Sequence, residues 1–448
     1  MSQPLGIALV SREYPPFYGG GIGTYARWIV PALASHGIRV HVITEAHDRT
    51  HPRIKCDGNI TVHRMPTGMG KGGWPNAALR FSIQAARQIA SLYRSGRVQV
   101  AEFAECEAAG IATLVSNPCR PPTVVQLHTP SEQLFVLRSL STRSVDIPHR
   151  IYFESERLAM HLADEILAPS RFIADWARNH YQFPRDPKVI PYATGPLPEL
   201  KVTRHPSDDL AVFYAGRIEP RKGVESLILA MNEVSRAFPT TTLRLAGADT
   251  SGAPDGGSMR AYLQSLIEPH AENNVRFLGR LDRDELKREY ARASLCVVPS
   301  LWENFPNTCI ESMSHARALL VSDQGGMQEM VGETRAGCTF TAGDPDDLAC
   351  KIKLMLAESA QSLAERGRIA RERIEFLCDP DRVATNRIEH FHHVIKNHSA
   401  SPSQNRVGAL KAWAGLESAL SGDTGSFQPP AVSQQLLRWV DRLEECLC

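Results

Sequence analysis

Short apolar runs alternate with longer segments of helical periodicity along most of the chain. Apolar runs of about four to eight residues bounded by turn residues indicate buried strands, and their alternation with helices is typical of βαβ units. Helices are predicted between several of the strands of the first half, for example over 24–35 and 74–94. The strands predicted for that half cover 5–11, 39–44, 60–65, 98–102, 123–128, 165–168 and 188–191.

A second series of the same kind begins near Asp209. Its predicted strands cover 210–215, 242–246, 275–278, 295–299 and 318–322. Helical patterns follow most of them, over 224–237, 259–270, 284–292 and 307–316, and further helical segments extend over 346–396. Parallel sheets with interspersed helices make this an α/β protein with two domains.

The break between the two series lies at 196–206, which contains three prolines and no clear period. We interpret it as a linker between an N-terminal domain, 1–198, and a C-terminal domain, 207–379. A return helix at about 380–397 is assigned to the first domain. The remaining residues, 398–448, form a helical tail interrupted by Pro, Ser and Gly, with amphipathic stretches at 407–420 and 434–447. These stretches either pack back on the body, which we favour, or dock a partner.

Composition narrows the class of protein. With 50 Lys and Arg against 49 Asp and Glu, the net charge of +1 argues against a nucleic-acid partner, which usually requires a basic domain. No apolar run approaches the roughly 20 residues that span a membrane, and the run at 5–10 is interpreted as a strand. Ten cysteines without paired short spacings favour free thiols. We therefore expect a cytoplasmic protein.

The first candidate for chemistry is Gly19-Gly20-Gly21-Ile22-Gly23, between the first strand and the first helix. Glycines allow close approach of the backbone to a ligand, and a helix N-terminus attracts phosphate. The spacing differs from the G-x-G-x-x-G of a dinucleotide site. By itself the motif predicts either a phosphate contact or only a turn.

The second motif is Gly216-Arg217-Ile218-Glu219-Pro220-Arg221-Lys222-Gly223, which follows the first strand of the second domain. Arg217 and Lys222 can both face one anion above the carboxyl end of that strand, where open α/β sheets bind ligands. Such cations neutralise a leaving diphosphate. The alternative is a solvated basic loop.

A third motif runs from Pro299 to Glu311 and contains Glu303 eight residues before Glu311. The first glutamate is placed in a loop and the second in the next helix, so one carboxylate can bind sugar hydroxyls while the other binds a ribose diol. A turn with the sequence Gly325-Gly326-Met327-Gln328-Glu329 follows downstream.

Taken together, these motifs resemble glycosyltransferase family 4 over about residues 5–395. The family's pattern is a Gly-rich first loop, a G-R-x-x-x-x-K-G loop and an E-x7-E motif that P-S precedes and a Gly-Gly turn follows. The resemblance implies the GT-B fold, with two Rossmann-like doubly wound domains facing a cleft. The first domain would be on the acceptor side, and the second would bind the nucleotide-sugar.

The resemblance also implies roles by matching position. Arg217 and Lys222 would hold the donor diphosphate, Glu311 would bind the ribose hydroxyls, and Glu303 would face the donor sugar. His128 matches a family histidine at the sugar and acceptor site, so the candidate catalytic residues are His128, Arg217, Lys222 and Glu303. The other candidate donor-binding residues are Gly20, Gly21, Ser170, Asn304, Phe305, Pro306 and Asn307.

The chain departs from the family's pattern at three places. Thr129 replaces an Asp that often follows the histidine. The usual Ile-Pro-Asn-Gly near the linker is Ile190-Pro191-Tyr192-Ala193, and the usual Ala-x-Gly after the second glutamate is replaced within 315–318. None of these departures affects the residues assigned to the diphosphate.

Family membership implies that the enzyme retains the anomeric configuration. Because no carboxylate of the motifs is an obvious nucleophile, we expect departure and attack on one face of the sugar, with His128 orienting and donating a hydrogen bond. Asp344-Pro345-Asp346 has the spacing of a metal-binding D-x-D motif, but Asp346 and Asp347 are better interpreted as helix N-terminal charges. No metal and no other cofactor is expected, since Arg217 and Lys222 can replace it.

Two basic features bear on partners. Arg80, Arg87 and Arg94 recur every seven residues on one predicted helix, which indicates a solvated face or, alternatively, peripheral contact with the inner face of a membrane. An irregular segment of the first domain is a candidate lining of the acceptor side and contains Arg138, Arg143, His149 and Arg150.

The prediction is thus a retaining hexosyltransferase that uses a UDP- or GDP-sugar donor. Its acceptor is a hydroxyl of a sugar, lipid-linked or small molecule, in polysaccharide, glycolipid or glycoconjugate biosynthesis. The alternatives are a sugar-nucleotide epimerase or hydrolase on the same scaffold, and a non-catalytic nucleotide-sugar binder.

Overall fold

A computed structural model describes residues 4–17, 20–48, 51–66, 76–115, 120–138, 147–183, 185–199 and 210–398. Their contacts divide the chain into two compact units. The first comprises Met1–Pro169 and Ile173–Ala193 and is completed by helix α14, Pro380–Asn397; the second comprises Ser170–Phe172 and Thr194–Asp379. The chain thus leaves the first unit at Ala193, five residues before the predicted limit, and the short segment Ser170–Phe172 packs with the second unit. The predicted tail stretches 407–420 and 434–447 lie outside the described residues.

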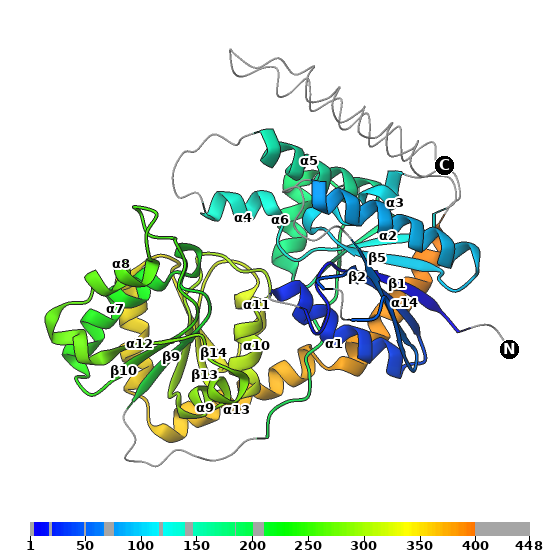
Figure 1. The fold of residues 1–448 in the computed structure, drawn as a ribbon. Helices are drawn as coiled ribbons and strands as arrows, with labels where there is room; N and C mark the ends of the chain where they lie inside the picture. Colours follow the sequence, from blue (N-terminus) through cyan, green and yellow to red (C-terminus); the bar gives the residue numbers. More distant parts are fainter. Residues whose placement is uncertain are drawn as a thin grey trace. The chain divides into compact units, whose positions relative to one another are not determined.

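The first unit contains an eight-stranded sheet in the order β3-β4-β2-β1-β5-β6-β7-β8. Figure 1 labels β1, β2 and β5 of this sheet. All neighbouring strands are parallel except β3, which pairs antiparallel with β4 and was not predicted. Its bounds are β1 Gly6–Val10, β2 Arg39–Glu45, β3 Ile54–Asp57, β4 Ile60–Met65, β5 Val100–Ala104, β6 Thr123–Gln126, β7 Glu165–Ala168 and β8 Lys188–Val189.

Helices cover both faces of this sheet, as in a doubly wound domain. Side chains of α2 pack on one face against Ala8 and Val10 of β1, while α1 packs against α14. Because alternate residues of a strand point to opposite faces and both faces are covered, the buried strands are mostly apolar along their length. The helices are α1 Gly21–Ser35, α2 Asn76–Arg94, α3 Ile111–Val115, α4 Ser131–Arg138, α5 Ile147–Leu162, α6 Arg171–Tyr181 and α14 Pro380–Asn397, with a 3₁₀ turn at Cys106–Ala108.

The second unit contains a six-stranded, fully parallel sheet in the order β11-β10-β9-β12-β13-β14. The core on one face joins β9 and β10 to α7, α8 and α12, while α10, α11 and α13 pack with β13. The strands are β9 Ala211–Ala215, β10 Thr242–Ala246, β11 Val275–Gly279, β12 Leu295–Val298, β13 Ala318–Ser322 and β14 Gly337–Phe340. The helices are α7 Val224–Ala237, α8 Met259–Ser265, α9 Arg283–Arg292, α10 Asn307–Ser314, α11 Met327–Val331, α12 Pro345–Leu356 and α13 Ala360–Leu377, with 3₁₀ turns at Pro220–Lys222 and Pro269–Asn274.

Both units are therefore Rossmann-like, as the sequence predicted, and the differences are local. Strand β14 was not predicted, because Gly337–Phe340 is short and only its last residue is buried. The helix predicted over 259–270 ends at Ser265, and a 3₁₀ turn beginning with Pro269 follows. Proline disfavours the helical conformation in the residue before it, here Glu268, so the helix cannot continue unbroken to 270. Within the described ranges, none of the helices combines the length and apolarity that crossing a bilayer requires.

Helix α14 belongs to the first unit because it buries a charged side chain there. Arg387 is completely buried, and its guanidinium donates to Glu102 Oε2 at 2.7 Å and to the Gln126 side chain. The same guanidinium lies over the ring of Tyr25, with 5.0 Å from its central carbon to the ring centroid. A buried cation requires such partners, so α14 can only dock in this register.

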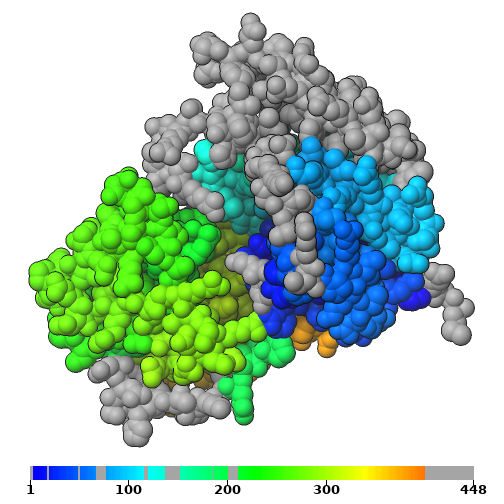
Figure 2. Space-filling model, in the orientation of Figure 1, coloured from blue at the N-terminus to red at the C-terminus, as the bar shows by residue number. Residues whose placement is uncertain are grey.

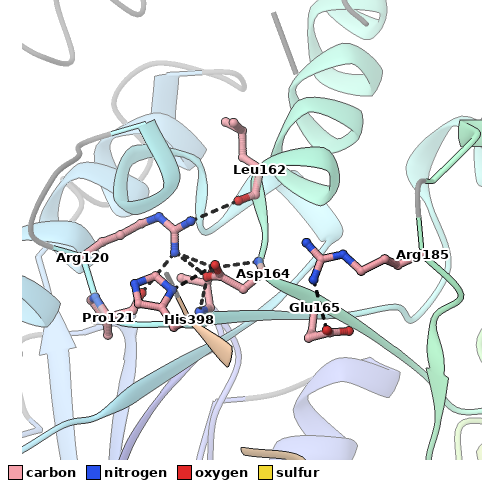
Figure 3. A network of polar contacts seen from close by, with 8 residues as sticks. Arg120, Pro121, Leu162, Asp164, Glu165, Arg185 and His398 are labelled. Carbon is pink, nitrogen blue, oxygen red and sulfur yellow. Dashed lines mark hydrogen bonds and ion pairs between the residues drawn. The ribbon is translucent and has the colours of Figure 1, made fainter. Parts of the chain in front are cut away.

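The end of α14 is held by a second polar network, centred on Asp164 before β7 (Figure 3). The carboxylate of Asp164 accepts from Arg120 Nη1 at 2.5 Å, from His398 Nδ1 at 3.0 Å, and from the backbone and hydroxyl of Thr123 at 2.8 Å each. Burial alone would raise the pKa of this carboxyl, but the hydrogen bonds from His398 and Arg120 hold it below its ordinary value.

We predict that Asp164→Asn lowers the free energy of unfolding by about 2–3 kcal/mol, because Arg120 loses its charged partner in a largely buried place. Urea unfolding at neutral pH measures the change. The adjacent variant Glu165→Gln is the matched control: its partner Arg185 is 55% exposed, and such pairs contribute below about 1 kcal/mol (Figure 3). Equal losses in the two variants would contradict the anchoring role of Asp164.

Candidate functional site

Two loops meet at one edge of the second sheet because the strands that precede them are neighbours. Strand β9 pairs in parallel with β12, so their carboxyl ends lie at the same edge. The loop after β9 contains the Gly216–Gly223 motif, and the loop after β12 contains Glu303. The backbone N–H of Leu301 donates to the carbonyl of Arg221 at 2.9 Å and joins the two loops directly. Residues about eighty positions apart are thus brought into one site.

These loops carry an alternating row of charges, which we call the charge row: Arg217, Glu219, Arg221, Glu303 and Lys222. Arg217 Nη2 lies 3.2 Å from Glu219 Oε1, and Arg221 Nη2 donates to the same oxygen at 2.8 Å. Arg221 Nη1 donates to Glu303 Oε1 at 2.8 Å, and Lys222 Nζ also pairs with that oxygen. The row holds three cations and two carboxylates, so its net charge is +1.

One end of the charge row, Arg217, is much more exposed than the rest. The side chain of Arg217 is 54% exposed, whereas those of Arg221 and Glu303 are almost completely buried. Burial by itself would raise the pKa of the Glu303 carboxyl, but the charges of Lys222 and Arg221 lower it below its ordinary value. Glu303 is therefore held as a carboxylate at neutral pH.

Glycine is required where the charge row approaches the next loop. Gly223 has φ of 65°, in the left-handed region that favours glycine, and a Cβ there would lie 1.9 Å from the carbonyl oxygen of Pro299. The Gly325-Gly326 turn supports Glu303 in the same way, since a Cβ on Gly325 would meet the carbonyl oxygen of Glu303 at 1.9 Å. The backbone N–H of Gly326 donates to that oxygen at 2.9 Å. These contacts explain why both motifs contain glycine at these positions.

The segment after Glu303 is also packed into this unit. The side chains of Asn304 and Phe305 are buried, Pro306 caps α10, and Asn307 is its first helical residue. Ser170 Oγ donates to Asn304 Oδ1 at 2.8 Å. The predicted donor-binding residues 304–307 thus follow Glu303 directly in the chain. Ser170 bonds to the first of them and packs with the second unit.

The second glutamate of the E-x7-E motif does not join the charge row. Glu311 lies on α10 and accepts a 2.9 Å hydrogen bond at Oε2 from the hydroxyl of Tyr290 on α9. Burial raises the pKa of Glu311, and the hydrogen bond from Tyr290 opposes that rise. The ring of Tyr290 stacks on His315 with 4.7 Å between centroids. The Glu311 carboxyl is therefore a second polar group, on the helix after the Glu303 loop, held by Tyr290, whose ring stacks on His315.

In the first unit, His128 follows β6 and lies among aromatic rings. Its backbone N–H donates to Glu105 Oε1 at 2.7 Å, and its Nδ1 lies 2.7 Å from the hydroxyl of Tyr192. The ring of Tyr25 meets the imidazole edge-on with 5.1 Å between centroids. Burial, and next the charge of Arg387, lower the pKa of His128 to about 3. The imidazole is therefore neutral at physiological pH.

Two buried carboxyls hold the loop that follows His128. Glu156 of α5 accepts from the backbone and hydroxyl of Ser131 at 2.9 and 2.7 Å and from the backbone of Glu107 at 2.8 Å. Glu105 and Glu156 are both buried. Burial raises the pKa of each to about 8, and for Glu105 the neighbouring Glu156 adds to the rise.

The glycine-rich first loop is arranged differently from the prediction. Helix α1 begins at Gly21 instead of Thr24, with Gly20 at its N-cap. The backbone N–H of Gly20 donates to Glu13 Oε2 at 3.1 Å, so a carboxylate of the protein lies where a phosphate was considered. Gly19 lies outside the described residues.

Two secondary predictions can also be compared with the structure. Asp344 caps α12 and accepts from the backbone N–H groups of Asp346 and Asp347, which confirms the interpretation of that motif as a helix start. On α2, Arg87 and Arg94 are exposed and Arg80 is half-buried, and the helix lies at the surface of the first unit (Figure 2). Arg143 lies outside the described residues, and so do the side chains of Arg138, His149 and Arg150.

The structure thus joins Arg217, Lys222 and Glu303 in one cluster, places Glu311 on a neighbouring helix, and holds His128 in the other unit. Sequence reasoning missed Glu219 and Arg221, which link the three clustered residues, and Tyr290, which binds Glu311. Opposite charges stand at every second position in Arg217, Glu219 and Arg221, and this pattern could have predicted that these side chains pair with one another. No comparable signal pointed to Tyr290, because helix α9 carries no motif.

Two family models match the chain. The model described as Glycosyltransferase Family 4 matches residues 19–193, and the model described as Glycosyl transferases group 1 matches residues 198–373. Between them they span both Rossmann-like units. The chain therefore belongs to the family 4, group 1 glycosyltransferases and is a sugar-transferring enzyme.

Relatives with known names extend over most of the chain. Glycogen synthase of Mycobacterium tuberculosis is 26% identical over 403 residues, which cover 85% of this chain and 92% of that protein. Sucrose-phosphate synthase of Thermosynechococcus elongatus has a TM-score of 0.68 at 21% identity and covers 88% of this chain and 100% of its own. HepE of Anabaena, solved in complex with UDP and glucose, has a TM-score of 0.59 at 19% identity, covering 86% and 99%. These structural likenesses identify the fold as GT-B.

We predict that Arg221→Met lowers the free energy of unfolding by about 3 kcal/mol, because it leaves Glu219 and Glu303 with less compensation in a buried place. Arg221→Lys should recover only part of this loss, since an ammonium lacks the planar fork that reaches both carboxylates. Denaturant unfolding measures both changes. Arg236→Met is the control and should cost below about 1 kcal/mol, because the Arg236 side chain that pairs with Glu233 and Glu268 is 52% exposed. A loss at Arg221 no larger than the control would contradict the bridging role.

A pH dependence follows from Glu105. Its raised pKa means that the native state holds the proton more tightly than the unfolded chain, so the stabilisation is complete below about pH 4.5 and is lost as the pH rises towards 8. We predict that Glu105→Gln flattens the decline of unfolding free energy over this interval by up to about 1.4 kcal/mol per pH unit. Urea unfolding from pH 5 to 8 measures the slope. The exposed-site variant Glu372→Gln should keep the wild-type slope. Parallel curves for Glu105→Gln and wild type would refute the prediction.

Proposed function

We propose that this enzyme transfers a hexosyl group from a nucleotide-sugar to a hydroxyl acceptor, with retention of anomeric configuration and without a metal ion. The observation that supports this proposal most strongly is the charge row in the second unit. It presents two cations, Arg217 and Lys222, in the loop at the carboxyl end of strand β9, where open α/β sheets bind ligands.

The charge row suits a diphosphate. Arg217 and Lys222 occupy the ends of the row, and each is paired with a carboxylate on one side. A diphosphate can draw both cations towards itself, while the buried Arg221 keeps Glu219 and Glu303 compensated. This exchange lets the site bind an anion without leaving a buried carboxylate unpaired.

The two glutamates are proposed to bind different parts of the donor. Glu303, held ionised by Arg221 and Lys222, accepts from hydroxyls of the sugar. Glu311 accepts from the ribose hydroxyls, and Tyr290 orients its carboxyl group through the bond to Oε2. HepE, a structural neighbour, is solved with UDP and glucose bound. A uridine diphosphate sugar is therefore the first donor class to test, with GDP-sugars next.

The proposed chemistry needs no covalent intermediate with the protein. The bond between the anomeric carbon and the phosphate oxygen breaks, and the acceptor oxygen bonds to the anomeric carbon from the same face. The acceptor's proton passes to an oxygen of the departing phosphate. Arg217 and Lys222 stabilise the negative charge that develops on the diphosphate, which is the work that a metal ion performs in other transferases.

His128 is assigned to the acceptor side of the reaction. It is neutral, because burial and Arg387 lower its pKa to about 3, so it is unsuited to carry a positive charge at neutral pH. We assign it the role of a hydrogen-bond donor to a sugar or acceptor hydroxyl. Glu105 holds its backbone and Glu156 holds the loop after it.

A thermal-shift screen of UDP- and GDP-sugars, followed by turnover of the best binder with candidate acceptors, tests this proposal. A donor present at 100 times its dissociation constant should add about 2.7 kcal/mol of stability. We predict that Lys222→Ala removes most of this shift and lowers kcat by about 10²–10³-fold, as loss of one charge-stabilising donor does elsewhere. Lys287→Ala, at a 60% exposed position of α9, is the control and should behave as wild type.

Three readouts separate the parts of the proposal. Unchanged turnover in Lys222→Ala would refute the diphosphate role. If a chelator abolished turnover and an added divalent cation restored it, metal independence would be refuted. An inverted product anomer would refute retention, and release of free sugar that no acceptor suppresses would favour hydrolysis.

A further inference from the structure

We propose that Tyr192 is a positioning residue that fixes His128 as a neutral imidazole with its proton on Nε2, ready to donate to a substrate hydroxyl. Tyr192 stands where the family pattern usually has the Asn of Ile-Pro-Asn-Gly. The inference rests on the proposed function only for the substrate hydroxyl. The position of the proton is a property of the protein by itself.

Nδ1 of His128 and the carbonyl oxygen of Leu127 compete for the single proton of the Tyr192 hydroxyl. The hydroxyl lies 2.7 Å from His128 Nδ1 and 3.4 Å from the carbonyl oxygen of Leu127. The first distance is optimal for a hydrogen bond, and the second is close to the limit. The phenol can donate to Nδ1, or it can donate to Leu127 while an N–H at Nδ1 donates to the phenol oxygen. Because the contact with Leu127 is the weaker one, we infer the first arrangement, in which Nδ1 carries a lone pair.

A neutral imidazole has one N–H, so a lone pair on Nδ1 places the proton on Nε2. Burial and the nearby Arg387 guanidinium keep the ring neutral, with a pKa of about 3. Burial also raises the pKa of Tyr192 well above its ordinary value, so the phenol keeps its proton and remains a donor. Both groups therefore hold one arrangement of protons across the working pH range.

The surrounding rings prevent the imidazole from turning over. Tyr25 meets it edge-on, and the Tyr192 ring lies 5.5 Å away at 34°. Tyr25 is itself held, since its hydroxyl donates to Glu102 and its ring lies beneath the guanidinium of Arg387. Rotation of the imidazole by 180° would put a C–H against the Tyr192 oxygen and lose the hydrogen bond.

The alternative is that Tyr25, His128 and Tyr192 only pack together as part of the aromatic core. Tyr192→Phe separates the two, because it keeps the ring and removes the hydroxyl. A role in packing alone leaves the ring nitrogens of His128 unaffected, whereas a role in positioning changes them. Tyr93→Phe, on helix α2 of the same unit, is the matched control.

The test is a long-range ¹H–¹⁵N correlation spectrum of the full-length protein labelled at its histidines, with His128→Gln used to assign the signals. We expect wild-type His128 to show a protonated Nε2 and a hydrogen-bonded, unprotonated Nδ1. In Tyr192→Phe the Nδ1 signal should move to that of an unbonded nitrogen, or the two tautomers should mix. Tyr93→Phe should match wild type.

A protonated Nδ1 in the wild type would overturn the proposal, and so would an unchanged His128 spectrum in Tyr192→Phe. Once a donor is known, Tyr192→Phe should lower kcat by about 3–10-fold, the effect of one hydrogen bond between neutral groups, with the donor KM unchanged. A rise in the donor KM alone would also contradict it. The spectra need no substrate, so they remain decisive even if the proposed reaction proves wrong.

Discussion

The buried carboxylate of Glu303 is the constraint on which the second unit's site depends. A carboxylate removed from water is costly unless cations compensate it, and Arg221 and Lys222 do so from a loop about eighty residues away in sequence. That pairing requires β9 beside β12 and glycine at the points of closest approach. Three features hold the Glu303 carboxylate next to its cations: the charge row, the loop that follows β12, and the Gly325-Gly326 turn against that loop.

The first unit obeys a similar constraint through Arg387. A fully buried guanidinium needs Glu102 and Gln126, and its position over the ring of Tyr25 connects helix α14 to the surroundings of His128. Its charge also helps keep the imidazole neutral. Arg387, on the last described helix, thus lowers the pKa of His128, which follows strand β6. The packing of α14 and the chemistry of His128 cannot be altered independently.

The sequence predicted most strands, both Rossmann-like units and the return helix, because buried parallel strands are mostly apolar and the helices between them are periodic. It did not predict β3, whose residues are all exposed, or β14, which is short. At the candidate site it predicted Arg217, Lys222, Glu303 and Glu311 from their motifs. Glu219 and Arg221 were missed although they lie inside a motif, because what makes them important is a partner in another loop.

The sequence by itself determined the family, the fold class and the residue types available for binding a diphosphate, because these depend on local patterns and on short motifs. Only the tertiary structure decided which charges pair, which carboxyls are buried, and which nitrogen of His128 faces Tyr192. Tyr192 shows the difference most clearly: in sequence it is a departure from a pattern, and in the fold it is a hydroxyl 2.7 Å from Nδ1. Distances between residues far apart in the chain are set by strand order and packing, which no local pattern contains.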